Sequence, residues 1–186
     1  ARAGIEHIAG LRVRVVAERG FRPWSEQPRE LVLLAIDDVG WTNMVQLTNL
    51  GHLCGGDWRG PRVDWRDLAR HAEGVICLAG APAASGLLGS YVEQADDPDE
   101  PVEALAIARR LADMYGDRLY VSLVFHGSAT DKVVNRGLLA IAQRLELGVV
   151  ATNAVRFATP EDALPHTVLG AIRGGRRADG LMTQPG

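Results

Sequence analysis

The sequence lacks the features that mark several common classes of protein. No apolar stretch approaches the roughly 18 residues that span a bilayer, and the opening residues "ARAGIEHIAG" lack a signal-peptide layout. The only cysteines, Cys54 and Cys77, are too few and too isolated for a disulfide framework or a CxxC metal site. A net charge of −3 produces no overall electrostatic attraction to DNA or to anionic membranes. We therefore expect a cytoplasmic protein with no membrane partner.

Motifs of common catalytic sites are also missing. The phosphate-binding patterns GxGxxG and GxxxxGK[ST] and the hydrolase elbow GxSxG are absent. Cys77 lies inside an apolar run, which favours a small buried side chain over a nucleophile. No histidine lies at HxH or HxxxH spacing; the five are His7, His52, His71, His126 and His166. Residue patterns alone therefore indicate an α/β domain without a recognisable active-site motif.

The chain has instead a regular alternation of apolar runs and helical patterns. Its 186 residues, 47% of them hydrophobic, fit one globular domain. Near-continuous Val/Leu/Ile runs predict buried parallel strands, although "LRVRVVA" alternates and could form an edge. These runs begin at Leu11, Leu31, Val75, Leu119 and Gly148. The alternation predicts an α/β fold with a parallel sheet or barrel.

Helix signals lie between and after these runs. Helices are expected over 37–53, 101–115, 130–147 and 159–173. The first would bury a stripe of Val39, Met44, Leu47, Leu50 and Leu53. The second would end at Gly116, and the third would be capped by Thr130 or Asp131. Surface loops are expected around 55–62 and 93–101.

Six segments, taken in order, resemble the PHP (polymerase and histidinol phosphatase) domain of bacterial DNA polymerase III alpha subunits and their error-prone relatives. They are "AGIEHIAGLRVRV", "LVLLAIDDVGWTNMVQLTNLGHL", "PRVDWRDLARHAEGVICLAG", "YGDRLYVSLVFHG", "VNRGLLAIAQRLELGVVATNAVRF" and "TPEDALPHTVLGAIRGG". The resemblance covers about residues 3–175 and leaves 176–186 as a tail or the start of another segment. It implies a single PHP-like domain fragment over 1–186.

The resemblance implies a distorted (β/α) barrel of parallel strands. In the family, a metal cluster at the strand C-terminal ends activates water for attack on a phosphoester. The first strand of the family, with its HxH pair, would lie before Ala1, so an incomplete barrel lacking its first βα units is expected. Both ends of the chain look cut from something longer.

Carried over position by position, the resemblance implies a degenerate metal site. Arg12 falls where metal-competent relatives carry Glu, Glu30 falls near an expected His, and Ala81 replaces Cys or His. In "TNAVRF", Ala154 and Arg156 replace the Asp and His of the family pattern TNDxH. Alanine offers no donor atom, and arginine stays protonated and repels a cation. No catalytic or metal-binding residue is therefore expected.

The loss of several ligands together is physically coherent. Buried carboxylates left without their cation would carry a desolvation cost of several kcal/mol per ion. Our sharper hypothesis places Arg12 and Arg156 at the former metal site as fixed cations, paired with Glu30 or with backbone carbonyls; the alternative is that both guanidinium groups face solvent without a partner. Head groups more than about 10 Å apart would contradict it. Asn153 and His126 are candidates for the rim of the site, although a structural turn histidine is preferred for His126.

The resemblance implies a segment of a replicative or error-prone DNA polymerase that serves as a scaffold and holds a proofreading exonuclease subunit. The segment would need no cofactor, whereas the parent polymerase would use Mg²⁺, DNA, deoxynucleoside triphosphates and other replicase subunits. One alternative is a metal-dependent PHP phosphoesterase or proofreading exonuclease whose remaining ligands lie upstream. Another is a stand-alone α/β ligand-binding module with a full open sheet.

Overall fold

The computed structural model describes residue 4 and residues 7–17, 29–54, 60–80, 85–153, 155 and 158–173. By its internal contacts the chain forms two compact units, Ala1–Thr152 and Asn153–Gly186. The first holds the sheet and most helices. The second contains the short turn η2 (Pro160–Asp162) and helix α6 (Ala163–Arg173). The expectation of a single domain over 1–186 stays a prediction.

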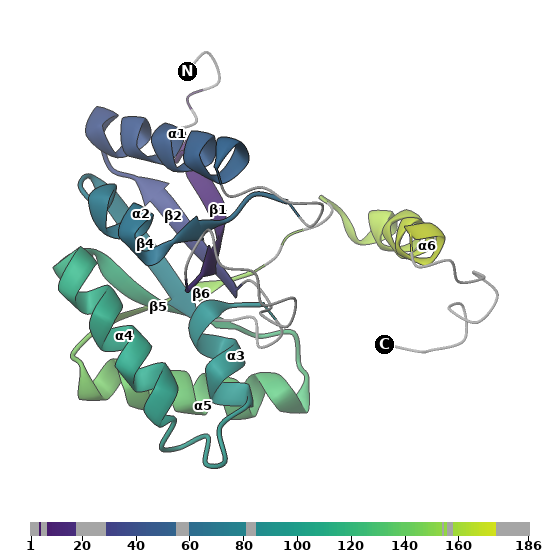
Figure 1. Cartoon of the computed structure of the whole chain (residues 1–186). Coiled ribbons are helices and arrows are strands. Elements are labelled where there is room, and N and C mark those ends of the chain that lie inside the picture. The colour runs from purple at the N-terminus through teal and green to yellow at the C-terminus, as the bar shows by residue number, and fades with distance from the viewer. Residues whose placement is uncertain are drawn as a thin grey trace. The chain divides into compact units, whose positions relative to one another are not determined.

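The first unit is built on a six-stranded open sheet with strand order β3-β1-β2-β4-β5-β6 (Figure 1). The strands are β1 (Gly10–Val16), β2 (Arg29–Ala35), β3 (Val63–Asp64), β4 (Val75–Gly80), β5 (Leu119–Val124) and β6 (Gly148–Thr152). All five predicted strands are confirmed, while the two-residue β3 was missed. In the described part of the chain β3 and β6 do not pair with each other, so the sheet is not closed. This arrangement agrees with a partial PHP barrel.

Strand β2 departs from the expected parallel arrangement. It runs antiparallel to both neighbours, β1 and β4, whereas β4, β5 and β6 are mutually parallel and β1 is parallel to β3. Antiparallel neighbours need no crossover helix, and no helical pattern separates the first two apolar runs of the sequence. Strand β1 lies between β3 and β2, so the suggestion that it could be an edge strand is wrong for the strand as a whole. It pairs with β2 over Gly10–Val15, but β3 reaches only Val15 and Val16.

In the part of the first unit that the structure describes, five α-helices accompany the sheet, and their arrangement is seen in Figure 1. They are α1 (Asp38–Leu53), α2 (Trp65–Arg70), α3 (Leu87–Glu93), α4 (Val102–Tyr115) and α5 (Ala129–Arg144). Helices α1, α4 and α5 confirm predictions, as does α6 in the second unit, whereas the short α2 and α3 were missed. Among the described residues no helix is both long enough and apolar enough to cross a membrane.

The ends of the helices follow local side-chain chemistry. Asp37 caps α1 by accepting a hydrogen bond from the Gly40 amide, and Gly116 ends α4 with φ of 58°. The predicted cap of α5 is wrong: Ser128, not Thr130 or Asp131, is the N-cap. Asp131 is the third residue of the helix and completes a capping box with Ser128.

The buried stripe of α1 also differs from the prediction. Met44 and Leu47 are buried as expected, but Val39 and Leu53 are exposed. The other buried residues of the helix are Gly40 and Gly51. A Cβ atom added to Gly40 would collide with the carbonyl group of Gly74. The helix therefore packs through small residues at its closest approach, which an apolar periodicity count cannot detect.

The two faces of the sheet have different environments. On one face Leu33, Cys77 and Leu119 are aligned across β2, β4 and β5 and join the hydrophobic core with residues of α1 to α5. On the other face a row that includes Arg12, Val32, Leu78 and Tyr120 crosses the sheet; Arg12 is exposed and the other three are only partly buried. We call these the covered face and the open face.

Candidate functional site

The strand directions bring several functional positions to one edge of the sheet. Strands β1, β4, β5 and β6 end at this edge, and the antiparallel β2 begins there. Open α/β sheets and barrels commonly place ligands outside the carboxyl ends of their strands. The candidate site comprises the charged and polar residues along this edge and the neighbouring open face.

Arg12, Glu30 and Arg14 form a charged cluster on the open face. Arg14 lies directly opposite Glu30 in the β1–β2 register, and Arg12 lies two positions away on the same face. Arg12 Nη1 is 3.6 Å from Glu30 Oε2, and Arg14 Nε is 3.8 Å from Glu30 Oε1. Glu30 is 18% exposed, against 55% for Arg12 and 42% for Arg14. One shielded carboxylate thus lies between two guanidinium groups.

The charged cluster borders a cleft of about 540 Å³ along β1. Thr48 and His52 of α1 and Pro61 line the same cleft. The ion-pair distances exceed the 2.7–2.9 Å of a fully hydrogen-bonded pair, and the two arginines remain in contact with solvent. The cluster therefore carries a net positive charge and offers guanidinium N–H donors, which attract anions and repel metal cations.

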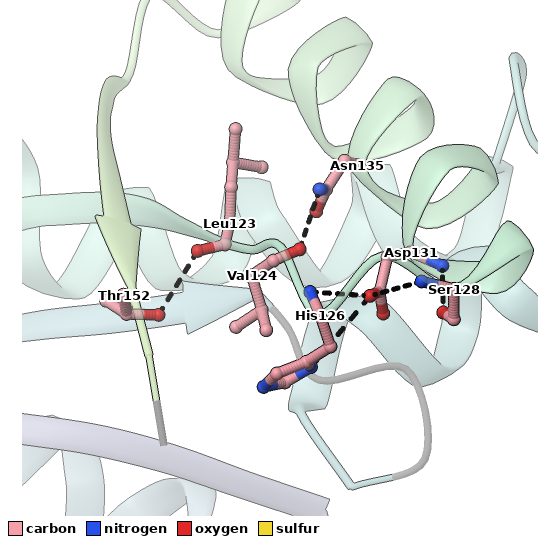
Figure 2. Close-up of polar contacts among 7 residues, drawn as sticks. All are labelled: Leu123, Val124, His126, Ser128, Asp131, Asn135 and Thr152. Carbon is pink, nitrogen blue, oxygen red and sulfur yellow. Dashed lines mark hydrogen bonds and ion pairs between the residues drawn. The ribbon is translucent and has the colours of Figure 1, made fainter. Parts of the chain in front are cut away.

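His126 lies in the turn between β5 and α5 (Figure 2). Its backbone N–H donates to Asp131 Oδ2 at 2.9 Å, and its ring Nδ1 is 3.9 Å from the same oxygen. The Ser128 amide also donates to Asp131, and the Asp131 amide donates to Ser128 Oγ. His126 thus belongs to the network that begins α5, which agrees with the preferred structural reading. Its place on the rim of a former metal site stays a prediction.

The same network sets the pKa of Asp131. Loss of solvent raises the pKa, but the hydrogen bonds from the His126 amide and from Ser128, together with the nearby His126 ring, outweigh it. The net effect lowers the pKa of Asp131 below its usual value. The carboxylate is consequently held in its charged form as a structural acceptor.

Two further side chains fix the end of β5 to its neighbours (Figure 2). Asn135 of α5 donates from Nδ2 to the carbonyl of Val124 at 2.9 Å, and Thr152 of β6 donates from Oγ1 to the carbonyl of Leu123 at 3.3 Å. Asn153, the second rim candidate, directly follows β6 and is exposed. These two hydrogen bonds tie the end of β5 to α5 and to β6.

The predicted ligand positions are only partly described. Arg12 lies beside Glu30, which is one of the two kinds of partner that the hypothesis named, while Ala81, Ala154 and Arg156 lie outside the described residues. Within the described ranges, no group of three or more His, Cys, Asp or Glu residues is arranged to hold a metal ion. The degenerate character of the full site therefore stays a prediction, as does the position of Arg156 relative to Arg12.

Sequence reasoning missed Arg14 and Ser128. A signal existed for each, because the alternation in "LRVRVVA" places Arg12 and Arg14 on one face and "SATD" matches the capping-box pattern. The prediction for Cys77 holds: the side chain is buried in β4, and burial raises the pKa of its thiol far above the usual range. A buried neutral thiol is a poor nucleophile.

Comparison with known proteins gives the family of the chain. The PHP domain family matches residues 1–126. The chain therefore belongs to the PHP domain family, which confirms the resemblance seen in the six segments. The mixed sheet and the edge where its strands end are thus parts of a PHP fold.

The relatives found are much longer proteins than this chain. The DNA polymerase III subunit alpha of Thermus aquaticus is 34% identical over 175 residues, a match that covers 91% of this chain and 14% of that protein. The corresponding proteins of Aquifex aeolicus and Caulobacter vibrioides are both 31% identical, over 77% and 93% of this chain. The chain spans only 12% and 15% of their respective lengths.

Proposed function

We propose that the chain is the PHP segment of a bacterial DNA polymerase III alpha-type polymerase, replicative or error-prone. The observation that supports this most strongly is the match to DNA polymerase III subunit alpha of Thermus aquaticus along 91% of the chain. The parent would extend DNA from deoxynucleoside triphosphates with Mg²⁺ held in a separate domain. The segment itself would have no catalytic group and no cofactor.

The second part of the proposal is that the metal site of this PHP segment is degenerate. The Arg12–Glu30–Arg14 cluster supports it, because two guanidinium groups 3.6 and 3.8 Å from the only acid of the cluster oppose binding of a divalent cation. Ala81, Ala154 and Arg156, which supply no usable ligand, support it at the level of sequence. A site of this kind serves as a scaffold, and we propose that it helps to hold a proofreading exonuclease subunit and other replicase subunits.

The experiment is carried out on the full-length parent polymerase. Template-directed DNA synthesis is measured with Mg²⁺, and phosphoesterase and 3′-exonuclease activities are measured with Zn²⁺, Mn²⁺ and Fe²⁺. We expect polymerase activity, no hydrolytic activity that depends on the PHP segment, and co-elution with the purified exonuclease subunit in size-exclusion chromatography. Absence of polymerase activity would contradict the family-level proposal, and absence of co-elution would contradict the docking role alone.

The principal alternative is a metal-dependent PHP phosphoesterase or exonuclease. Hydrolysis that disappears when Glu30→Gln is introduced, while DNA synthesis is unchanged, would favour this alternative. The control is Glu103→Gln, which removes an exposed acid from the first turn of α4. Glu103 lies on another element and is not a lining residue of the β1 cleft.

A further inference from the structure

The cleft along β1, of about 540 Å³, is enclosed by three parts of the first unit. Residues 11–14 of β1 form one wall, the C-terminal half of α1 forms the second, and residues 60–63 form the third. The second and third walls meet at Gly51, where an added Cβ atom would lie 3.3 Å from Pro61 Cβ. The volume falls within the range of about 300–1,000 Å³ that is usual for small-molecule pockets.

Positive charge dominates the lining of this cleft. The described lining includes three arginines, Arg12, Arg14 and Arg62, and one acid, Glu30. Three positive charges and one negative charge leave a surplus of two positive charges, before any contribution from His52. The chain as a whole carries a net charge of −3, so the cleft opposes the overall sign. It therefore attracts a ligand with about two negative charges.

The guanidinium groups reach the cleft from different directions. Arg12 and Arg14 leave β1 on one face at alternate positions, which lie about 6–7 Å apart along a strand. Arg62 belongs to the third wall. The same wall approaches Arg14, because a Cβ atom added to Gly60 would lie 3.1 Å from Arg14 Nη1. Donors spread in this way match a ligand group whose acceptor oxygens also point in several directions.

The shared carboxylate does not occupy the whole of the charged cluster. Glu30 contacts Arg12 through Nη1 and Arg14 through Nε, at 3.6 and 3.8 Å. Each guanidinium group has five N–H donors in a planar fork. A single acid that meets one nitrogen of each fork at these distances leaves the surplus positive charge of the lining in place.

The cleft is larger than one anionic group requires. A water molecule accounts for about 30 Å³ of liquid volume, so a phosphate or carboxylate group alone would fill only a small part of 540 Å³. Leu11 is half-buried and Pro61 is exposed, and both contribute apolar surface to the lining. The exposed Thr48 adds a hydroxyl group from α1. The cleft therefore has room for an organic group beside the anion.

We propose that the cleft binds a small-molecule phosphate monoester. Its phosphate group lies between the guanidinium groups of Arg12, Arg14 and Arg62, and its organic group lies against the apolar lining. A monoester carries about 1.5 to 2 negative charges at pH 7 and three terminal oxygens, whereas a diester or a carboxylate carries one charge. This inference rests on the proposal that the charged cluster holds no metal, because here the arginines alone supply the positive charge.

The test is a titration of the ¹⁵N-labelled chain with phenyl phosphate, in a phosphate-free buffer that contains EDTA. The matched control is methyl phenyl phosphate, a diester with the same ring and a single negative charge. We expect saturable shifts of the β1 amide signals and binding of the monoester about tenfold tighter than that of the diester. Equal affinities, or no saturable shift at millimolar phenyl phosphate, would overturn the proposal.

Two further arms separate the alternatives. Binding that is absent in EDTA and appears with Zn²⁺ or Mn²⁺ would show a metal-mediated site and would contradict the proposed loss of metal binding as well. Absence of binding with and without metal would overturn the present inference alone. An oligothymidylate without terminal phosphates carries only diesters. If it shifts the same signals with an affinity equal to that of phenyl phosphate, the preference for a monoester is wrong.

Variants then locate the binding site. Arg12→Gln should weaken binding of phenyl phosphate by about tenfold. Glu30→Gln should tighten it several-fold, because the surplus of positive charge rises from two to three. Arg109→Gln, which removes an exposed cation from α4, is the control and should leave binding unchanged.

The opposite signs expected for Arg12→Gln and Glu30→Gln distinguish electrostatic recognition from a general loss of structure. The dispersion of the amide spectrum shows first that each variant is folded. Weaker binding in Glu30→Gln, equal to that in Arg12→Gln, would contradict the proposed role of the surplus charge. A loss in Arg109→Gln as large as that in Arg12→Gln would show non-specific attraction and contradict the site.

Discussion

The covered and open faces of the sheet differ in how completely they are packed. On the covered face Leu33, Cys77 and Leu119 are 0%, 0% and 1% exposed and contact the helices in one core. On the open face Arg12, Val32, Leu78 and Tyr120 keep contact with solvent. The covered face therefore carries most of the stability, and charges on the open face can change without loss of the core.

The largest expected effect comes from truncation of the covered face. Leu33→Ala should reduce the free energy of unfolding by about 2–5 kcal/mol, because it leaves a cavity in a closed core. Leu34→Ala, one residue along β2 on the open face, should cost about 1 kcal/mol. Urea denaturation followed by circular dichroism measures both. Similar losses for the two variants would contradict the difference between the faces.

A smaller effect is expected where α1 approaches the loop before β4. Gly40→Ala should reduce stability by about 1–3 kcal/mol, because its Cβ atom has no room beside the Gly74 carbonyl. Gly170→Ala in α6 is the control, because a Cβ atom there meets no neighbour within 4 Å. Thermal denaturation compares the two. An unchanged melting temperature in Gly40→Ala would show that the backbone around Gly40 and Gly74 can shift to accommodate the added Cβ atom.

The contribution of the capping network of α5 to stability should depend on pH. The pKa of Asp131 is lowered in the folded chain, so its contribution to stability is present above its unfolded pKa of about 3.9 and is lost as pH falls through the folded value. The melting temperature of wild type should therefore fall toward that of Asp131→Asn as pH drops from 6 to about 2.5. A difference between the two proteins that stays constant over this range would contradict this role.

The smallest effect is expected on the open face itself. Glu30→Gln should change the free energy of unfolding by no more than about 1 kcal/mol, because its arginine partners are substantially exposed. The effect should shrink further in 1 M NaCl, where charges are screened over about 3 Å. Denaturation at low and high salt tests this. A loss as large as that of Leu33→Ala would show that the cluster is structurally essential.

The difference in packing between the covered and open faces also explains which features could be predicted from the sequence. The runs around Leu33, Cys77 and Leu119 lie on the covered face, where burial imposes a strong apolar pattern, and all were identified as strands. The antiparallel direction of β2 was missed because periodicity carries no information on strand direction. At the candidate site, Glu30 was one of two partners suggested for Arg12, whereas the contact of Arg14 with Glu30 depends on the β1–β2 register. That register becomes visible only when the two strands are paired, whereas the Ser128 cap is local and its pattern "SATD" is present in the sequence but was not recognised.

The central claim is that this PHP segment does not bind metal, and the bound metal of the full-length parent tests it most directly. The parent is purified without chelators in the presence of Zn²⁺, Mn²⁺ and Fe²⁺, dialysed, and analysed by inductively coupled plasma mass spectrometry. A variant carrying Arg12→Glu, Ala154→Asp and Arg156→His serves as the comparison. We predict that wild type retains no stoichiometric metal and that the variant gains bound metal. Stoichiometric metal in wild type, lost on Glu30→Gln, would contradict the account.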